Sequence, residues 1–256
     1  MKIAVITGAS SGMGREFALQ LPKWEKFDEI WVIARRRERL ESLEAEIGVR
    51  TRVFALDLTR EESFDEYAAA LAECKPEVSV LVNCSGYGKF GKYDEIPLDD
   101  SIGMIRLNSE AVVWMTTLTL PYMKKGSKIA NLDSLSSFQP VPYMAVYGAT
   151  KAFVLSYTRA LGRELVPRGI KTIAICPGWV ATEFFDRATT TNDKAVVYYN
   201  RVYKADEVVK TALHDMYRTK KDVSIHGFPV KVQVFLVKLL PHKLVMRVWL
   251  KQQKHI

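Results

Sequence analysis

Tyr147 and Lys151 lie four residues apart in the stretch VYGATKAF, which has the pattern of the start of a helix. Residues at i and i+4 project from one face of a helix, so the phenol and the ammonium are close enough to interact. Such a pair can transfer a proton, because a nearby cation lowers the pKa of a tyrosine, ordinarily about 10. The alternative is a surface pair in which the lysine stem lies along a half-exposed ring. Spacing alone favours the surface pair, so other motifs must decide.

A glycine-rich turn, TGASSGMG at residues 7–14, follows the first apolar run and precedes a helical pattern. Gly8, Gly12 and Gly14 permit a tight turn and let backbone N–H groups approach a phosphate at the positive end of the helix. Between the strand and helix of a βαβ unit, this pattern indicates a dinucleotide site. The alternative is that the glycines serve only close packing of the helix on the strand.

Two arginines follow the second apolar run, in the stretch IARRRERL. In dinucleotide-binding folds an acid at this point accepts hydrogen bonds from the adenosine ribose, whereas an arginine suits a 2′-phosphate. The chain has no acid between Ile30 and Arg37, and it places Arg35 and Arg36 there. The alternative is that these arginines are exposed to solvent at the start of a helix. That interpretation is weaker, because cations are disfavoured at helix N-termini. Arg35 therefore favours NADP(H).

The elements that must position these groups alternate between strands and helices. Strands, mostly continuous apolar runs as expected where both faces are covered, are predicted at 2–7, 29–34, 51–57, 79–84, 128–134, 171–176 and 222–226. Helices are predicted at 14–22, 37–47, 61–74, 99–124, 147–166 and 205–218. The alternation predicts a Rossmann-like, doubly wound α/β fold with a seven-stranded parallel sheet and helices on both faces. We expect one domain over 1–227 and a distinct tail over 228–256.

The composition is that of a globular chain with a basic excess. Its 256 residues are 48% hydrophobic and 26% charged, and the net charge is +8. That charge suits an anionic partner, but the basic residues are dispersed and no nucleic-acid-binding signature occurs, so nucleic acid is not expected. The sequence has no apolar run of about 18 residues, no signal-peptide pattern and no metal-ligand spacing around Cys74, Cys84 or Cys176. We expect a cytoplasmic protein without a metal site.

Together these motifs resemble the short-chain dehydrogenase/reductase family, in its single-domain, NADP(H)-preferring form. The similarity runs from residue 2 to about 226 and includes TGASSGMG, ARR, LDL at 56–58, NCSG at 83–86 and PGWVAT at 177–182. NCSG departs from the family's Asn-Asn-Ala-Gly at Cys84 and Ser85, which are small replacements at a packing position. The resemblance implies NADP(H) as the cofactor, bound by Gly8, Ser10, Ser11, Gly12, Met13, Gly14, Arg35, Arg36, Asp57, Leu58, Asn83, Ser85, Gly86, Tyr147, Lys151, Pro177, Gly178, Val180 and Thr182.

The resemblance also gives the Tyr147–Lys151 pair a catalytic role. The family carries a Tyr-x-x-x-Lys pair, a serine that Ser134 matches thirteen residues before Tyr147, and an asparagine that Asn108 matches. It implies hydride transfer between a nicotinamide and a carbonyl or secondary alcohol, with Tyr147 as general acid and base. Lys151 is expected to lower the pKa of Tyr147 and to bind the nicotinamide ribose, and Ser134 to position the substrate oxygen.

Two alternatives remain open at this point. By resemblance Asn108 holds a water that relays protons, but an asparagine within a helix can instead bond neighbouring backbone. A non-catalytic NADP(H) sensor, or a scaffold at a membrane surface, could use the same fold. The complete set of Asn108, Ser134, Tyr147 and Lys151 argues against it, because a binding protein has no need of the tyrosine.

Substrate recognition is expected in a loop over about 179–204. Ser136, Tyr143, Trp179, Phe184 and Phe185 are the candidate contacts, although aromatic residues here could equally be packing. Their character suggests a small-molecule substrate that is a hydrophobic ketone or alcohol, steroid-like or acyl-like.

The tail 228–256 mixes apolar and basic residues at helical spacing, and Pro241 splits it into two predicted helices. A basic amphipathic helix can lie on an anionic membrane, which would make the protein peripherally membrane-associated. The alternatives are a cap over the substrate pocket and a subunit interface. We expect a homo-oligomer, either a dimer or a tetramer.

Overall fold

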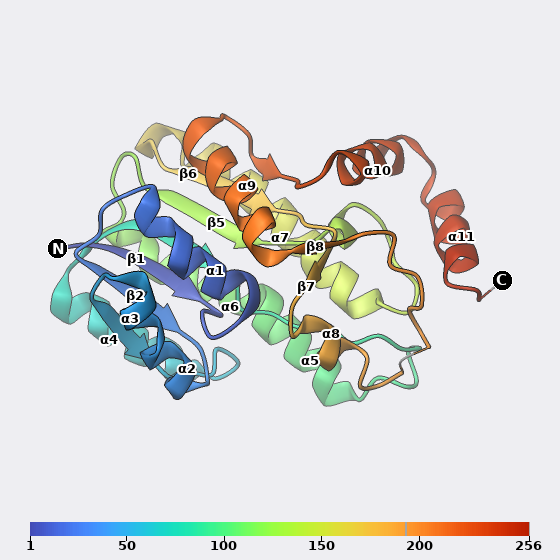
Figure 1. Cartoon of the computed structure of the whole chain (residues 1–256), viewed down its shortest axis with the longest axis horizontal. Coiled ribbons are helices and arrows are strands. Elements are labelled where there is room, and N and C mark those ends of the chain that lie inside the picture. The colour runs from blue at the N-terminus through green and yellow to red at the C-terminus, as the bar shows by residue number, and fades with distance from the viewer. Residues whose placement is uncertain (193, 256) are drawn as a thin grey trace.

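The computed structural model describes residues 1–192 and 194–255. Its centre is a sheet of seven parallel strands in the order β3-β2-β1-β4-β5-β6-β9 (Figure 1). The strands are β1 Lys2–Thr7, β2 Glu29–Ile33, β3 Thr51–Phe54, β4 Glu77–Asn83, β5 Lys128–Leu132, β6 Lys171–Ile175 and β9 Val223–Ser224. Nearly every residue of β1, β2 and β4 is buried, as strands covered on both faces require. The predicted doubly wound α/β fold is confirmed.

Helices form a layer on each face of the sheet. They are α1 Gly12–Gln20, α2 Arg37–Glu41, α3 Leu43–Ile47, α4 Glu61–Cys74, α5 Leu98–Ile105, α6 Ala111–Thr119, α7 Ala145–Glu164, α8 Phe184–Ala188, α9 Ala205–Arg218, α10 Phe228–Leu239 and α11 His242–Gln252. On one face, α1 and α9 pack together and bury Phe17 and Leu213. On the other, α4 and α6 bury Leu71 and Met115. Both layers leave the carboxyl edge of the sheet open.

The crevice at that edge follows from the strand order. The order reverses between β1 and β4, so the connections after these two strands leave in opposite directions and a crevice opens between them. Thr7 joins the two strand ends, because its Oγ1 accepts hydrogen bonds from the N–H groups of Cys84 (3.0 Å) and Ser85 (3.1 Å). The glycine turn after β1 is thereby fixed beside the chain after β4.

A second, two-stranded parallel sheet was not predicted from the sequence. It pairs β7 (Trp179–Ala181) with β8 (Val202–Lys204), and Val180 lies opposite Tyr203. The segment between them, 182–201, contains α8 and lies beside the carboxyl edge of the main sheet (Figure 1).

Two predicted helices are interrupted. The helix predicted at 99–124 consists of α5, a π-helical turn at Arg106–Glu110 and α6, and the side chain of Asn108 in that turn bonds outside the helix. The helix predicted at 37–47 breaks at Ser42, whose Oγ donates to the Arg39 carbonyl (3.1 Å) and so competes with the backbone ladder.

The tail helices α10 and α11 lie at the end of the molecule far from the N-terminus (Figure 1). Pro241 separates them, as the sequence indicated. Within residues 1–192 and 194–255, no helix combines the length and apolar character needed to cross a membrane.

Candidate active site

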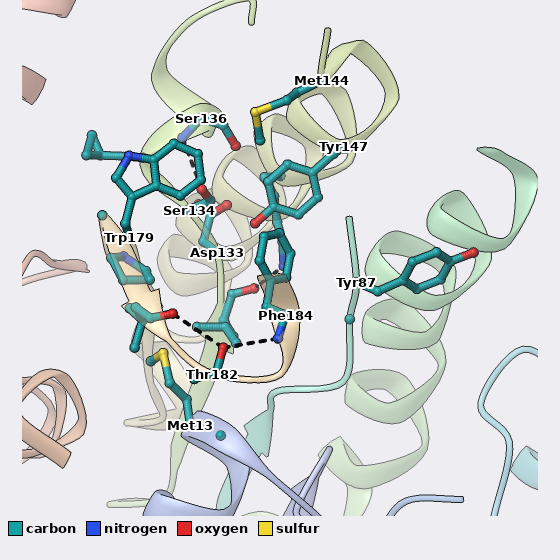
Figure 2. A pocket seen from close by; sticks show the side chains of 18 of the residues that line it. Met13, Tyr87, Asp133, Ser134, Ser136, Met144, Tyr147, Trp179, Thr182 and Phe184 are labelled. Atoms are coloured by element: carbon teal, nitrogen blue, oxygen red, sulfur yellow. Dashed lines mark hydrogen bonds between the residues drawn. The ribbon is translucent and has the colours of Figure 1, made fainter. Parts of the chain in front are cut away.

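A cavity of about 820 Å³ opens at the carboxyl edge of the sheet. The glycine turn forms one end of it, and β5, α7 and the chain around β7 form its walls. Figure 2 shows Ser134 and Tyr147 in this cavity, with Trp179 and Phe184 nearby. The tail helices α10 and α11 contribute its outer part.

The glycine turn leaves no room for a side chain at Gly8 or Gly14. Gly8 and Gly12 have φ angles of +69° and +53°, a region that glycine enters without steric penalty. A Cβ on Gly14 would lie 2.3 Å from the Gly8 carbonyl oxygen, and one on Gly8 would lie 2.8 Å from the Cys84 carbonyl oxygen. The turn therefore brings bare backbone and the N-terminus of α1 to the cavity, where a phosphate could meet N–H groups.

Arg36 is already held by protein groups. Its guanidinium donates to Ser10 Oγ (3.2 Å) and Ser11 Oγ (2.9 Å), and it forms an ion pair with Glu183 (2.8 Å). Glu183 also pairs with Arg39. Arg36 therefore ties the glycine turn to the start of segment 182–201.

Arg35 also lines the cavity, and its surroundings differ. Among the residues that the structure describes, no carboxylate lies within ion-pair distance of it. Burial of Asp57 raises the pKa of that carboxyl, but hydrogen bonds from Thr59 and the charge of Arg35 outweigh burial and bring the pKa below its ordinary value. Arg35 is thus a cation at the cavity edge that is available to a ligand.

Tyr147, Lys151 and Ser134 converge on the opposite wall. Tyr147 and Lys151 are both buried on α7, and the Lys151 ammonium lies 5.9 Å from the centre of the Tyr147 ring. Lys151 Nζ donates to the carbonyl of Leu132 (2.7 Å) at the end of β5. Two residues later Ser134 is extended, and its Oγ accepts from the Ser136 N–H (3.2 Å). The Tyr147 hydroxyl points toward Ser134 (Figure 2).

The pKa shifts of this group differ from the expectation. Burial raises the pKa of Tyr147 above its usual range, although a hydrogen bond with Ser134 opposes the change. Burial also lowers the pKa of Lys151, against the pull of the Asp133 carboxyl. The net pKa of Tyr147 is therefore raised because desolvation of the phenol dominates, and the pKa-lowering effect of Lys151 stays a prediction. A neutral phenol at the cavity wall is a proton donor.

Asp133 is a buried acid in the cavity wall that the sequence analysis missed. It is 2% exposed and immediately precedes Ser134. Its Oδ2 accepts from Cys176 Sγ (3.4 Å), whereas its Oδ1 has no hydrogen-bond partner in the described part of the chain. Burial raises the pKa of Asp133 to about 7, despite the opposing charge of Lys151. The only sequence signal was an acid at the end of an apolar strand, a position that solvent often reaches.

Asn108 is fully buried and lies outside the cavity lining. Its Oδ1 accepts from the Tyr87 N–H (3.0 Å), and its Nδ2 donates to the Tyr87 carbonyl (2.9 Å) and to Thr150 Oγ1 (3.1 Å). A Cβ on Gly86 would come within 2.9 Å of Asn108 Oδ1. Asn108 thus holds the chain after β4 against α7 by bonding the Tyr87 backbone and the Thr150 side chain, and its water relay stays a prediction.

Aromatic rings crowd the outer half of the cavity. The Phe184 ring centre lies 5.4 Å from that of Tyr147 and 6.0 Å from that of Phe185. Trp179 contacts Tyr199 edge to face at 4.9 Å. A ligand that reaches Tyr147 from this side passes between aromatic side chains.

Besides Asp133 Oδ1, two more polar atoms of the lining have no partner in the described part of the chain. Ser136 Oγ and Gln139 Oε1 are buried and have no hydrogen-bond partner among residues 1–192 and 194–255. Both residues line the cavity. Unpaired buried polar atoms are rare in proteins, so these two are candidates to bond a ligand.

Most of the residues predicted for the site line this cavity. They are Gly8, Ser10, Ser11, Gly12, Met13, Gly14, Arg35, Arg36, Asp57, Leu58, Ser85, Gly86, Ser134, Ser136, Tyr147, Lys151, Pro177, Gly178, Trp179, Val180, Thr182, Phe184 and Phe185. Like Asn108, Asn83 and Tyr143 are not among the lining residues. Asn83 Nδ2 donates to Asn131 Oδ1 (2.9 Å) between β4 and β5, and the Tyr143 ring stacks on His255 with the centres 3.8 Å apart.

Comparison with known proteins identifies the family of this chain. Residues 2–193 match the family model for short chain dehydrogenase. An uncharacterized oxidoreductase of Staphylococcus epidermidis is 33% identical over 183 residues, which cover 71% of this chain and 79% of that protein. A very-long-chain 3-oxoacyl-CoA reductase of Bos taurus is 35% identical over 201 residues, which cover 75% of this chain and 63% of that protein. This chain therefore spans less than two thirds of the bovine relative.

A solved structure extends the agreement to three dimensions. A short-chain dehydrogenase from Sphingobium yanoikuyae in complex with NADPH has a TM-score of 0.79 and 28% identity, over 93% of this chain and 92% of that chain. The matched family region includes the glycine turn and the Ser134, Tyr147 and Lys151 positions. The chain belongs to the short-chain dehydrogenase family of oxidoreductases.

Proposed function

We propose that this protein is an NADP(H)-dependent oxidoreductase that interconverts a carbonyl and a secondary alcohol. The observation that carries the proposal is the convergence of the glycine turn, Arg35, Ser134, Tyr147 and Lys151 in one cavity. A protein that only bound a dinucleotide would need the turn and the arginine. It would have no use for a buried phenol that points toward a serine hydroxyl.

The chain's own side chains supply the proton chemistry, and a bound nicotinamide would supply or accept the hydride. During reduction the carbonyl oxygen gains negative charge and takes the proton of the Tyr147 hydroxyl. Burial keeps this phenol protonated around neutral pH, so it is prepared to donate. Ser134 Oγ donates to the same oxygen and holds it next to the phenol. The Lys151 ammonium, fixed by the Leu132 carbonyl, favours the phenolate that remains.

The preference for NADP(H) rests on Arg35. The glycine turn suits the phosphates that NADP(H) and NAD(H) share, because its glycines leave backbone N–H groups open to them. A side chain at Gly8 or Gly14 would collide there with backbone. Arg35 lines the same cavity, and its hydrogen-bond donors are available to a ligand. The guanidinium of Arg36, in contrast, already bonds Ser10, Ser11 and Glu183. A 2′-phosphate gives such an arginine a bidentate partner. The solved relative from Sphingobium yanoikuyae is in complex with NADPH, which supports this choice.

The substrate we propose is a bulky hydrophobic ketone or alcohol, steroid-like or acyl-like. Aromatic rings of segment 182–201 and apolar side chains of α10 and α11 line the outer cavity. Ser136 Oγ and Gln139 Oε1 offer two polar contacts for a second functional group of the substrate. The name of the bovine relative, a very-long-chain 3-oxoacyl-CoA reductase, is consistent with an acyl-type substrate.

The test is Tyr147→Phe, which keeps the ring and removes the proton donor. Turnover of a hydrophobic ketone, followed by NADPH absorbance, should fall by about 10²-fold or more. Folding and NADPH affinity should stay near the parental values, because the hydroxyl has no packing role.

Tyr157→Phe is the matched control. Tyr157 lies on the same helix, stacks on Phe153 and does not line the cavity, so its variant should keep parental turnover. Parental turnover in a folded Tyr147→Phe protein would contradict the proposed role of the phenol.

A further inference from the structure

Helix α10 is apolar on two opposite faces. Val230, Val234 and Val237 are buried against the rest of the protein. On the other side Phe228, Phe235 and Leu239 are 78%, 62% and 65% exposed. Positions 228, 235 and 239 fall on one face of a helix, so these side chains form a continuous stripe. Packing within the described protein explains the first face and leaves the second without a partner.

The adjoining helix α11 carries a row of cations beside exposed apolar side chains. Lys243, Arg247 and Lys251 lie four residues apart on one face and are exposed. Leu244 and Val248 next to them are 45% and 47% exposed. We call the exposed stripe of α10 and this face of α11 the tail surface.

The charge of the tail has one sign. Residues 228–256 include Lys231, Lys238, Lys243, Arg247, Lys251 and Lys254 and contain no Asp or Glu, so they supply six of the eight net positive charges of the chain. All six side chains are exposed. Within the described part of the protein none of them forms an ion pair, because every salt bridge there involves other residues. The partner that complements this surface is therefore anionic and apolar at once.

The tail helices also border the mouth of the cavity, next to the tail surface. Val232, Leu236, Leu240 and Val248 line the cavity and are nevertheless 40%, 48%, 40% and 47% exposed. Side chains that are both lining and exposed mark the rim of an opening. A ligand leaving the cavity on this side emerges among the exposed apolar residues of α10 and α11.

We propose that the tail surface docks on an anionic lipid bilayer, with α10 and α11 lying in the plane of the headgroups and the cavity mouth facing the lipid. An interfacial helix needs an apolar face that enters the acyl boundary and flanking cations that meet anionic headgroups. The tail surface has both the apolar stripe and the exposed cations. This proposal does not depend on the proposed activity.

A second copy of the chain fits the surface less well. A two-fold interface places the same patch against itself, so it would gather the tail cations of both copies with no tail carboxylate to pair with them. Like charges facing each other across an interface are strongly unfavourable. The anionic bilayer removes this repulsion and turns the same charges into an attraction.

The test measures binding of the full chain to vesicles of phosphatidylcholine alone and of phosphatidylcholine mixed with phosphatidylserine, by co-sedimentation. We expect binding to the mixed vesicles that weakens as salt rises. Lys243→Gln/Arg247→Gln/Lys251→Gln should bind them roughly 10²-fold more weakly, since each cation near an anionic surface contributes severalfold. Phe235→Ser/Leu239→Ser should also lose at least about tenfold, because it removes the apolar contact.

The matched control is Lys23→Gln/Lys26→Gln/Lys220→Gln, which removes the same charge from exposed residues outside the tail. It should bind the mixed vesicles within about twofold of the parent, because its cations lie outside the docking surface. Equal binding to both vesicle types, no binding to either, or equal losses in the two triple variants would overturn the proposal. It would also be overturned if Phe235→Ser/Leu239→Ser dissociated an oligomer in analytical ultracentrifugation while leaving vesicle binding unchanged, because the surface would then join copies of the chain.

Discussion

The contrast between Arg35 and Arg36 leads to a quantitative prediction about cofactor choice. Arg36 is engaged by Ser10, Ser11 and Glu183, whereas Arg35 lines the cavity with no ion-pair partner in the described protein. The change to make is Arg35→Ala. It removes one guanidinium at the cavity edge and leaves the glycine turn and the buried groups around Tyr147 in place.

The magnitude follows from the contact that would be lost. A hydrogen bond to a charged group contributes about 1.5–3 kcal/mol, so the Kd for NADPH should rise by about tenfold to 150-fold. NADH lacks the 2′-phosphate, so its Kd should change by less than about threefold, the range of a distant surface charge. The preference for NADPH over NADH should therefore shrink by at least about tenfold in the variant.

The assay is a titration of both dinucleotides by calorimetry at one fixed ionic strength. Arg37→Ala is the control, because Arg37 is an exposed neighbour that pairs with Glu41 at 3.6 Å on the same short helix. Its two Kd values should match the parental ones. If Arg35→Ala weakened NADH as much as NADPH, or if the parent bound both equally, the assignment of Arg35 to the 2′-phosphate would be refuted.

Three other substitutions test the site and its supports. The folded-state pKa of Asp133, about 7, lies above the ordinary 3.8, so its contribution to stability is full below pH 4 and is lost as pH rises through 7. Urea unfolding of the parent should lose about 2–3 kcal/mol from pH 5 to pH 8 that Asp133→Asn does not lose, and identical pH dependence would contradict this. In Gly14→Ala the new Cβ would lie 2.3 Å from the Gly8 carbonyl oxygen. Thermal unfolding should therefore show about 1–3 kcal/mol of destabilisation, and NADPH should bind more weakly. A parental melting temperature would contradict the steric argument. Gln253→Leu removes the oxygen that accepts hydrogen bonds from the N–H groups of residues 197 and 198 (2.8 and 2.9 Å). Hydrogen exchange at those two amides should become faster, while exchange in β1 stays slow. Unchanged exchange at 197 and 198 would contradict this prediction.

Much of the fold could be predicted because the sequence patterns that indicate it lie within single segments and recur along the chain. The apolar runs that became β1, β2 and β4 are buried on both faces, and a continuous apolar run is what that environment requires. The glycine turn could be read for the same reason, since Gly8 and Gly14 occupy positions that any Cβ would disrupt. Helices α4 and α9 begin and end at the predicted residues 61–74 and 205–218.

The features that were missed depend on tertiary contacts. Strands β7 and β8 have three residues each, too few for a periodic pattern, and they exist because Val180 and Tyr203 are brought together. The π-helical turn around Asn108 reflects bonds to Tyr87, which precedes it by 21 residues. The burial of Asp133 depends on what packs over the end of β5. No pattern within those segments reveals these partners.

The pairing of β7 with β8 has a consequence for how the family member can diversify. The two strands hold the ends of segment 182–201 next to each other, so the interior of that segment is a closed loop of 20 residues. The entropy of closing such a loop grows only with the logarithm of its length, and doubling it adds about 0.6 kcal/mol. Insertions or deletions that spare Glu183 and Phe184, which contact Arg36 and Tyr147, therefore cost little closure entropy. Under the proposed function, the substrate range can change through this one loop, while Ser134, Tyr147 and Lys151 keep their places in the wall of the cavity.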